Sequence, residues 1–203
     1  MAALVTGRAP TARADGCPDV ELVFARGTAE PPGLGRVGDA LFAALQPALG
    51  SRSVQAYAVN YAASYNFLTT ADAANDARDH IAFMAGQCPA THLVLGGYSQ
   101  GASAVSMLAG VPPVGQRIGN LGSAPPLDPG LAGKVAAVAV FGNPGNRFNT
   151  PLSTAGAFAG RAIDLCSSGD PVCVVGGRDR EAHDVYQEPP YPGQAAGFVA
   201  GRV

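Results

Sequence analysis

The sequence predicts a three-layer α/β/α sandwich around a mainly parallel central sheet. Short apolar runs of strand character alternate with stretches of helical spacing, which is the pattern of successive βαβ units. The 203 residues suffice for one sizeable hydrophobic core and are few for two. No internal repeat or break in composition divides the chain, so we expect residues 16–203 to form a single domain.

The first half of the chain supplies two strands and two helices. Val20–Ala25 is a run of Val, Leu and Phe that ends at a glycine-containing turn. Arg36–Leu49 has apolar residues at helical spacing, whereas Ser53–Val59 alternates as a strand does. Asp72–Gly86 again has helical spacing, and its first residue is of a type that caps helices.

The second half continues the alternation. Thr91–Leu95 is an apolar strand, and Gln100–Ala109 is the helix that follows it. Val111–Lys134 contains several Pro and Gly and is expected to be a long, partly ordered loop of functional importance. The uninterrupted apolar run Val135–Phe141 is typical of a strand buried on both faces. A further strand and a C-terminal helix complete the order: Arg161–Leu165 and Gln194–Arg202.

Composition and charge exclude several classes of protein. Apolar residues make up 47% of the chain and charged residues 14%, which favours a compact domain over a disordered one. The net charge is -2 and the basic residues form no run, so we expect no nucleic-acid partner. No apolar stretch approaches the length that crosses a bilayer. We expect a monomer.

Residues 1–15 are expected to lie outside the fold. Ala12-Arg13-Ala14 is similar to the small-residue end of a secretory signal, but the apolar segment Ala2–Val5 is too short for a complete signal core. The segment is therefore either the remnant of a longer leader or a disordered tail.

Four cysteines allow three disulfide connectivities. Cys166 and Cys173 are close in sequence and could close a small loop, which would leave Cys17 and Cys88 to close a long one. We expect no metal site, because no C-x-x-C pair exists and the three His are far apart. Two disulfides would indicate an oxidising compartment, and four buried thiols are the alternative.

The most informative segment is Gly96-Gly97-Tyr98-Ser99-Gln100-Gly101-Ala102. It contains the G-x-S-x-G pattern of a nucleophile elbow, directly after an apolar strand and before a helix. The glycines allow the serine to sit on a tight, strained turn, and the helix N-terminus points backbone N–H groups toward charge that develops near Ser99. The alternative is a glycine-rich turn with an idle serine.

This segment, F-A-R-G-T at residues 24–28 and D-L-C-S-S-G-D-P-V-C at residues 164–173 together resemble the cutinase family. The similarity is greatest to the cutinase-like esterases of mycobacteria and their relatives, and it runs from about Cys17 to the C-terminus. The resemblance implies a lidless α/β-hydrolase fold, two disulfides, hydrolysis of carboxylic esters, and secretion or association with the cell envelope.

A serine nucleophile requires a base and a carboxylate that orients the base. In this fold the chain order is Ser, then acid, then His, and His183 is the one His after Ser99. Asp170 is our choice of acid, because it lies in a loop between two cysteines whose disulfide would hold the carboxylate in place. The resemblance gives the same residues. Asp179 is the alternative acid, and Asp164 is expected to end a strand.

The remaining histidines precede the nucleophile. His80 lies at helical spacing and His92 opens a strand, so we expect structural roles for both.

The oxyanion needs two hydrogen-bond donors. Gln100 follows the nucleophile and is expected to offer its backbone N–H, and the second donor is expected from Gly27-Thr28. The resemblance implies that Thr28 supplies both its backbone N–H and its hydroxyl.

These residues predict a serine esterase that works through an acyl-enzyme and needs no cofactor or metal. The substrate is expected to be an ester of short to medium acyl chain, from a lipid or a polyester. Apolar loop residues either line an acyl groove or pack against the domain: Leu121, Pro125, Pro126, Leu127, Val174 and Val175. An acyltransferase or thioesterase with the same triad, or a non-catalytic secreted binding protein, are the alternatives.

Overall fold

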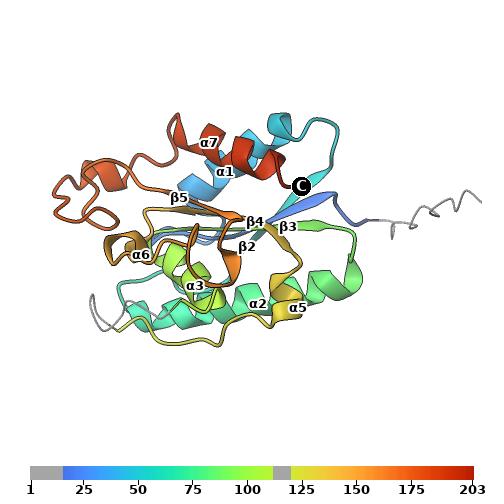
Figure 1. Cartoon of the computed structure of the whole chain (residues 1–203), viewed down its shortest axis with the longest axis horizontal. Coiled ribbons are helices and arrows are strands. Elements are labelled where there is room, and N and C mark those ends of the chain that lie inside the picture. Colours follow the sequence, from blue (N-terminus) through green and yellow to red (C-terminus); the bar gives the residue numbers. More distant parts are fainter. Residues whose placement is uncertain (1–15, 112–119) are drawn as a thin grey trace, which may run out of the picture.

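The chain folds as a three-layer α/β/α sandwich whose middle layer is a five-stranded sheet (Figure 1). The computed structural model describes residues 16–111 and 120–203. The strands are, in chain order, β1 Val20–Ala25, β2 Val54–Ala58, β3 His92–Tyr98, β4 Val135–Phe141 and β5 Ala162–Leu165. They lie in the order β2-β1-β3-β4-β5, and every neighbouring pair is parallel. The predicted fold class is confirmed.

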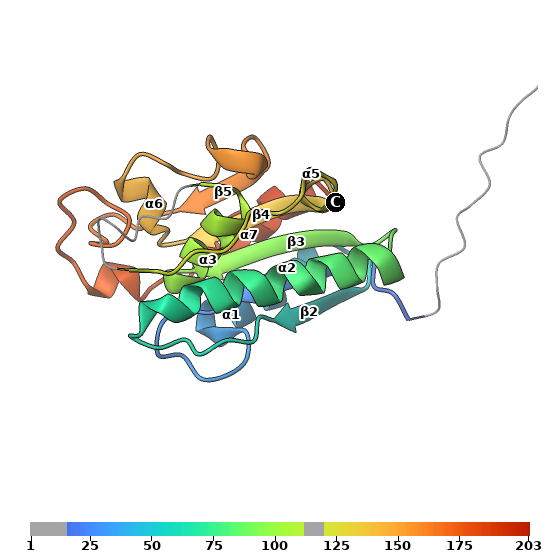
Figure 2. The same cartoon turned by 90° about the horizontal axis from the view of Figure 1, so that it is seen from below.

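Helices cover both faces of this sheet (Figures 1 and 2). One face carries α1 Gly35–Ala48 and α7 Tyr191–Ala200. The other carries α2 Thr70–Gln87, α3 Gln100–Leu108 and the short α5 Pro129–Ala132. Shorter helical turns lie in the loops: α6 Pro144–Arg147, η1 Phe67–Thr69, η2 Gly156–Phe158 and η3 Glu181–His183.

The chain reverses its direction across the sheet between β1 and β3. It moves outward from β1 to β2 through α1, and then returns across β1 to β3 through α2 on the opposite face. In open parallel sheets, ligands bind at such a switch point, outside the carboxyl ends of the strands. The turn at Thr28 follows β1 and Ser99 follows β3, so both lie at this point.

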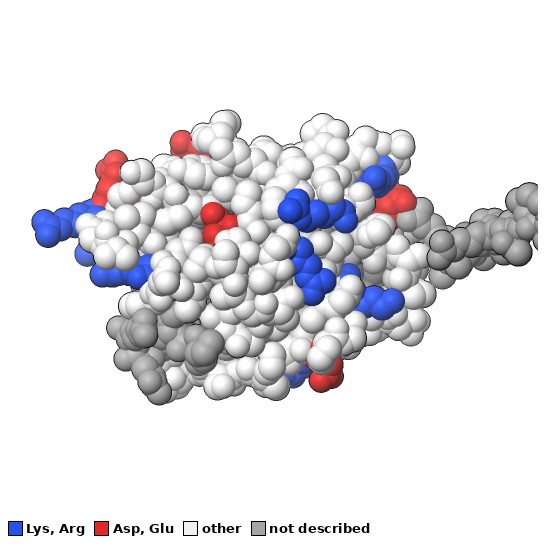
Figure 3. All heavy atoms as spheres, in the orientation of Figure 1, with Lys and Arg blue, Asp and Glu red and all other residues white. Residues whose placement is uncertain are grey.

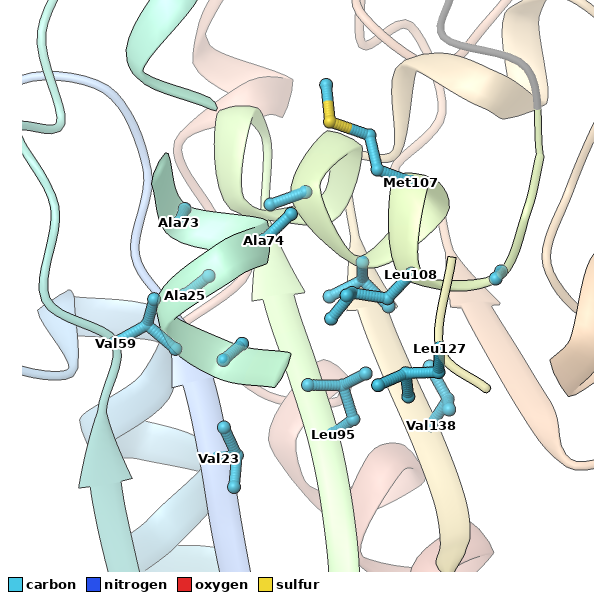
Figure 4. Packing of buried hydrophobic residues seen from close by; sticks show 14 of the residues in the cluster. Val23, Ala25, Val59, Ala73, Ala74, Leu95, Met107, Leu108, Leu127 and Val138 are labelled. Atoms are coloured by element: carbon cyan, nitrogen blue, oxygen red, sulfur yellow. The ribbon is translucent and has the colours of Figure 1, made fainter. Parts of the chain in front are cut away.

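Two hydrophobic clusters hold the three layers together. Val23, Leu95 and Val138 belong to the cluster between the sheet and helices α2 and α3, part of which Figure 4 shows. Phe24 points to the other face and packs with Leu41 of α1. Fully burying a side chain of this size contributes about 1.5–3 kcal/mol. Burial on both faces explains why the central strands β1, β3 and β4 are mostly apolar, whereas the edge strand β2 alternates and is only partly buried.

Several boundaries differ from the sequence prediction. The helix α2 begins at Thr70, and its N-cap is Thr69, so the prediction that Asp72 caps it is wrong. Thr69 makes no capping bond, because its hydroxyl donates to the carbonyls of Ala62 and Asn66. Asp72 still lies in the first turn, where the helix dipole favours a carboxylate.

Strand β3 continues three residues beyond its predicted end at Leu95. Gly96 is needed within it, because a Cβ there would lie 2.5 Å from the ring of Phe24. The helix α7 begins at Tyr191, three residues before the predicted start, because proline is tolerated in the first turn. The helix α5 lies within the segment predicted as a loop. Of that segment, residues 112–119 lie outside the described residues, as does the predicted tail 1–15.

Both predicted disulfides are present, Cys17–Cys88 and Cys166–Cys173. Within residues 16–111 and 120–203, no helix has the length and the apolar character of a bilayer span. Figure 3 shows one face of the molecule, which is mostly uncharged and carries side chains of both signs.

Candidate active site

Ser99 sits on a strained turn between β3 and α3. Its φ is 53° and its ψ is -111°, a backbone conformation that L-residues rarely adopt. A Cβ on Gly97 would lie 2.5 Å from the carbonyl oxygen of Gly101, and a Cβ on Gly101 would lie 1.9 Å from that of Ala25. Both glycines are therefore required for α3 to pack this closely against the strands, which is the sharp elbow that the pattern predicts.

Three of the predicted side chains come together at the carboxyl edge of the sheet. The Nε2 atom of His183 lies 2.9 Å from the Oγ of Ser99, and its Nδ1 lies 2.8 Å from the Oδ2 of Asp170. An ionised carboxylate only accepts hydrogen bonds, so Nδ1 carries the proton and Nε2 is left to accept from the serine hydroxyl. The geometry suits proton transfer from Ser99 to His183.

Asp170 is completely buried and accepts hydrogen bonds at both oxygens. The backbone N–H of Val172 donates to Oδ1 at 2.7 Å, and Tyr186 Oη donates to Oδ2 together with His183. Burial alone would raise the pKa of Asp170, but the hydrogen bonds from His183, Tyr186 and Val172 lower it below its ordinary value. The carboxylate is thus held in its charged form.

The backbone of His183 is held from the side of β3 and α1. Tyr98 Oη donates to the carbonyl of His183 at 2.7 Å, and Arg36 Nη2 donates to Tyr98 Oη at 3.1 Å. The same guanidinium pairs with Asp184, the residue after the histidine. Burial raises the pKa of Tyr98 to about 12, although the bond from Arg36 opposes this, so the phenol remains a donor at neutral pH.

Thr28 and Gln100 face each other across the switch point. The Thr28 hydroxyl donates to the side-chain Oε1 of Gln100 at 3.1 Å, and Gln100 Nε2 donates to Thr70 Oγ1 at 3.2 Å. As the first residue of α3, Gln100 has a backbone N–H without an acceptor inside the helix. The structure therefore brings the side chains of the two predicted oxyanion residues into contact, with Gln100 directly after Ser99 in the chain.

The turn that carries Thr28 is fixed by buried polar contacts. Arg26 is 4% exposed and donates to the carbonyls of Glu30, Val59 and Tyr61. The Glu30 carboxylate accepts from the backbone N–H of Gly27 at 2.6 Å. These bonds satisfy the polar groups of a turn that would otherwise be mobile.

The alternative acids are engaged elsewhere. Asp179 accepts from the backbone N–H groups of Glu181 and Ala182, and Asp164 accepts from those of Leu152 and Ser153. Neither carboxylate bonds to His183 in the structure.

The two earlier histidines lie away from this cluster. His80 of α2 stacks on Tyr57 with ring centroids 3.5 Å apart, and its Nε2 lies 3.0 Å from Glu21 Oε2. His92 is exposed at the amino end of β3.

The apolar loop residues divide into two groups. Leu121 and Leu127 are buried in the cluster beside α2 and α3, so they pack against the domain. Val175, in contrast, is 77% exposed. No group of three or more His, Cys, Asp or Glu within the described ranges is arranged to hold a metal ion.

Four residues that support His183 and Asp170, directly or through one another, were missed by the sequence analysis: Arg36, Tyr98, Asp184 and Tyr186. Tyr98 lies inside the elbow pattern and Tyr186 lies three residues after His183, so nearness in sequence was the available signal for these two. Nothing local marks Arg36, whose partner Asp184 is 148 residues away.

The geometry can be compared with known proteins. The family model described as Cutinase matches residues 16–203. The chain belongs to the cutinase family. Among curated cutinase-family relatives, it is 50% identical to "Probable carboxylesterase Culp3" of Mycobacterium tuberculosis over 96% of this chain and 72% of that protein. It is 48% identical to "Phospholipase Culp4" of the same organism, over 98% of this chain and 85% of that protein.

Solved structures agree with membership of the cutinase family. A Trichoderma reesei cutinase in complex with a phosphonate inhibitor is 32% identical, with a TM-score of 0.70 over 93% of this chain and 78% of that one. An acetylxylan esterase is 24% identical, with a TM-score of 0.77 over 92% of this chain and 99% of the other, and supports the fold alone.

Proposed function

We propose that this cutinase-family protein is a serine esterase in which Ser99 is the nucleophile, His183 the general base and Asp170 the residue that orients it. Its family and relatives make it a carboxylic ester hydrolase. Two consecutive hydrogen bonds carry the assignment of residues. Ser99 Oγ lies 2.9 Å from His183 Nε2, and His183 Nδ1 lies 2.8 Å from Asp170 Oδ2.

The reaction proceeds in two acyl-transfer steps. Ser99 Oγ attacks the ester carbonyl while its proton passes to His183 Nε2, and the imidazolium then protonates the departing alcohol. Water attacks the acyl-enzyme with His183 again as base, and the acid leaves as Ser99 regains its proton. Asp170 keeps the imidazole in the required tautomer and stabilises its charged form.

The negative charge on the carbonyl oxygen is stabilised by the backbone N–H groups of Thr28 and Gln100 in this proposal. Thr28 Oγ–H already donates to Gln100 Oε1, so the hydroxyl must rotate if it is to donate to the oxyanion as well. The backbone donors need no such rearrangement, which is the property that makes an oxyanion hole effective.

The proposed substrates are esters of short to medium acyl chain, from lipids or polyesters. The relative named as a phospholipase extends this class to phospholipid esters. We also propose that the protein acts outside the cytoplasm, as a secreted or envelope-associated enzyme, because its two disulfides persist in oxidising compartments.

The test is hydrolysis of p-nitrophenyl esters from acetate to palmitate by the native protein and by Ser99→Ala. The matched control is Ser103→Ala, which removes a buried hydroxyl one helical turn further along α3. We expect activity with a maximum at one chain length, lost in Ser99→Ala and kept in the control. Equal hydrolysis by Ser99→Ala would contradict the proposal.

The same assay separates the alternatives. With a competing alcohol present, an acyltransferase forms mainly the new ester, whereas the proposed esterase forms mainly the free acid. Parallel thioester substrates test for a thioesterase. A native protein that hydrolyses no ester and does not react with an organophosphonate would instead be a binding protein.

A further inference from the structure

Tyr186 is a buried phenol that touches the proposed triad but that the mechanism above does not use. It is 0% exposed, and its ring lies among those of Tyr98, Phe141 and Tyr191, with centroid distances of 5.8, 6.1 and 5.0 Å. The ring is therefore fixed by residues at the ends of β3 and β4 and at the start of α7. A ring held in this way has little freedom to move its hydroxyl.

The hydroxyl of Tyr186 joins two segments of the loop after β5. It donates to Asp170 Oδ2, and it accepts from the backbone N–H of Ser167 at 2.9 Å. Because its single proton goes to the carboxylate, both roles are satisfied at once. The sulfur of Cys173 lies 3.3 Å from the same oxygen, so the disulfide packs against the phenolic hydroxyl.

We propose that Tyr186 is a positioning residue, which fixes the Asp170 carboxylate through its phenolic hydrogen bond so that the carboxylate faces His183. This inference rests on the proposed function, because it assigns Tyr186 a part in the same set of hydrogen bonds. Oδ2 accepts hydrogen bonds from Tyr186 Oη and His183 Nδ1, and Oδ1 accepts one from the backbone N–H of Val172. Without the phenol, the carboxylate loses one of three donors in a site that water does not reach.

The protonation states fit this role. Burial and the bond to Asp170 raise the pKa of Tyr186, so the phenol stays protonated and remains a donor. The same bond is one of the causes that lower the pKa of Asp170. The other titratable groups that face this pair are His183, Tyr98 and Tyr191, and Tyr98 in turn bonds to Arg36 and Asp184.

The test compares Tyr186→Phe with Tyr191→Phe. The first removes only the hydroxyl and keeps the ring, and the second does the same in a neighbouring tyrosine that does not bond to Asp170. We expect kcat of Tyr186→Phe to fall by about 10-fold with KM unchanged, because the phenol is buried away from substrate and acts on a charged group. Tyr191→Phe keeps the native kcat.

A second measurement does not depend on activity. Carbon-13 NMR of the Asp170 carboxyl follows its titration in the native protein and in both variants. The pKa of Asp170 rises in Tyr186→Phe, which has lost a donor to the charged form, and it stays at the native value in Tyr191→Phe. Pure packing by the ring would leave this titration unmoved, and the spectra themselves report whether the variant is folded.

The outcomes separate the two proposals. An active native enzyme whose Asp170 titration or kcat is unchanged in Tyr186→Phe overturns this inference alone. A native protein that hydrolyses no ester, while its Asp170 titration moves in Tyr186→Phe, overturns the proposed function and leaves the bond to the carboxylate supported.

Discussion

The two disulfides lie at opposite ends of the parallel strands, one at their amino ends and the other at their carboxyl ends. They therefore constrain different parts of the molecule. Cys17 precedes β1 and Cys88 follows α2, so their bond closes a long stretch of chain, with a sequence separation of 71. Cys166 follows β5 and is bonded to Cys173, with a sequence separation of 7. The sulfur of Cys173 lies 3.2 Å from Asp170 Oδ2, whereas the long-range bond is at the amino edge of the sheet.

Loop-closure entropy explains why the two disulfides differ in how much they contribute to the free energy of unfolding. Closing a loop of this longer length destabilises the unfolded chain by about 4.4 kcal/mol, and closing the shorter one by about 2.4 kcal/mol. The long-range bond therefore contributes mainly to stability. The short bond contributes less, and its position beside the buried carboxylate indicates that it holds the geometry of the site.

The same contrast extends to the two edges of the sheet. At the amino edge, polar groups pair in ordinary conformations, as where Thr91 Oγ1 donates to the carbonyl of Pro18 at 2.7 Å. At the carboxyl edge, Ser99 has a positive φ and Asp170 is a fully buried charge. The strained Ser99 and the buried Asp170 thus both lie where the chemistry is proposed, and the rest of the fold must compensate for them.

The largest expected effect is that of Asp170→Asn on activity. An amide can donate to His183 Nδ1 and so favours the wrong tautomer, and kcat is expected to fall by about 10⁴-fold while the fold is kept. Initial rates on a p-nitrophenyl ester and far-ultraviolet circular dichroism measure the two quantities. Asp179→Asn is the matched control, and a comparable loss in that variant would transfer the role to Asp179.

Removing each disulfide by paired Cys→Ser substitutions tests the comparison itself. Without Cys17–Cys88, the free energy of unfolding is expected to fall by about 4.4 kcal/mol, with kcat of the folded protein unchanged. Without Cys166–Cys173, the loss is about 2.4 kcal/mol, but kcat falls on the order of 10- to 100-fold because Asp170 is no longer held. Urea unfolding and kcat on the same samples give both values, and the reverse assignment of effects would break the comparison.

Gly101→Ala tests the close approach at the carboxyl edge. The new Cβ would overlap the carbonyl of Ala25, so the free energy of unfolding is expected to fall by about 3 kcal/mol or more. Gly193→Ala in α7 is the control, because its Cβ meets open space, and it is expected to gain about 0.4–1 kcal/mol. Equal stability of the two variants in thermal unfolding would show that the elbow is not tightly packed.

The smallest expected effect is on stability in acid. Since the pKa of Asp170 is lowered in the folded protein, its charged form stabilises the fold above the unfolded pKa of about 3.9. That contribution is lost as the pH falls through the lower folded pKa. The difference in unfolding free energy between the native protein and Asp170→Asn should therefore shrink below about pH 4, and a constant difference from pH 7 to pH 2 would contradict the account.

The sequence was informative where a feature is local. The elbow at Ser99 depends on glycines two residues away on either side, and Asp170 lies between two nearby cysteines, so short patterns were enough to propose both. The central strands were predicted from their apolar runs, because a strand that is buried on both faces is apolar along most of its own length.

The supports of the site could not be predicted in this way. Arg36 reaches Tyr98 across 62 residues and Asp184 across 148, and no spacing rule connects such positions in a single sequence. The predicted start of α7 at Gln194 was three residues late, because Pro192 lies in the first helical turn, which does not need its N–H group.

Labelling the protein with a p-nitrophenyl phosphonate and locating the adduct by peptide mass spectrometry tests most directly whether Ser99 is the nucleophile. We expect one adduct per chain, on Ser99, and none on Ser103 or Ser106 of the helix that follows it. We also expect Asp170→Asn to slow the labelling strongly. An adduct on another serine, or a folded native protein that is not labelled, would contradict the account.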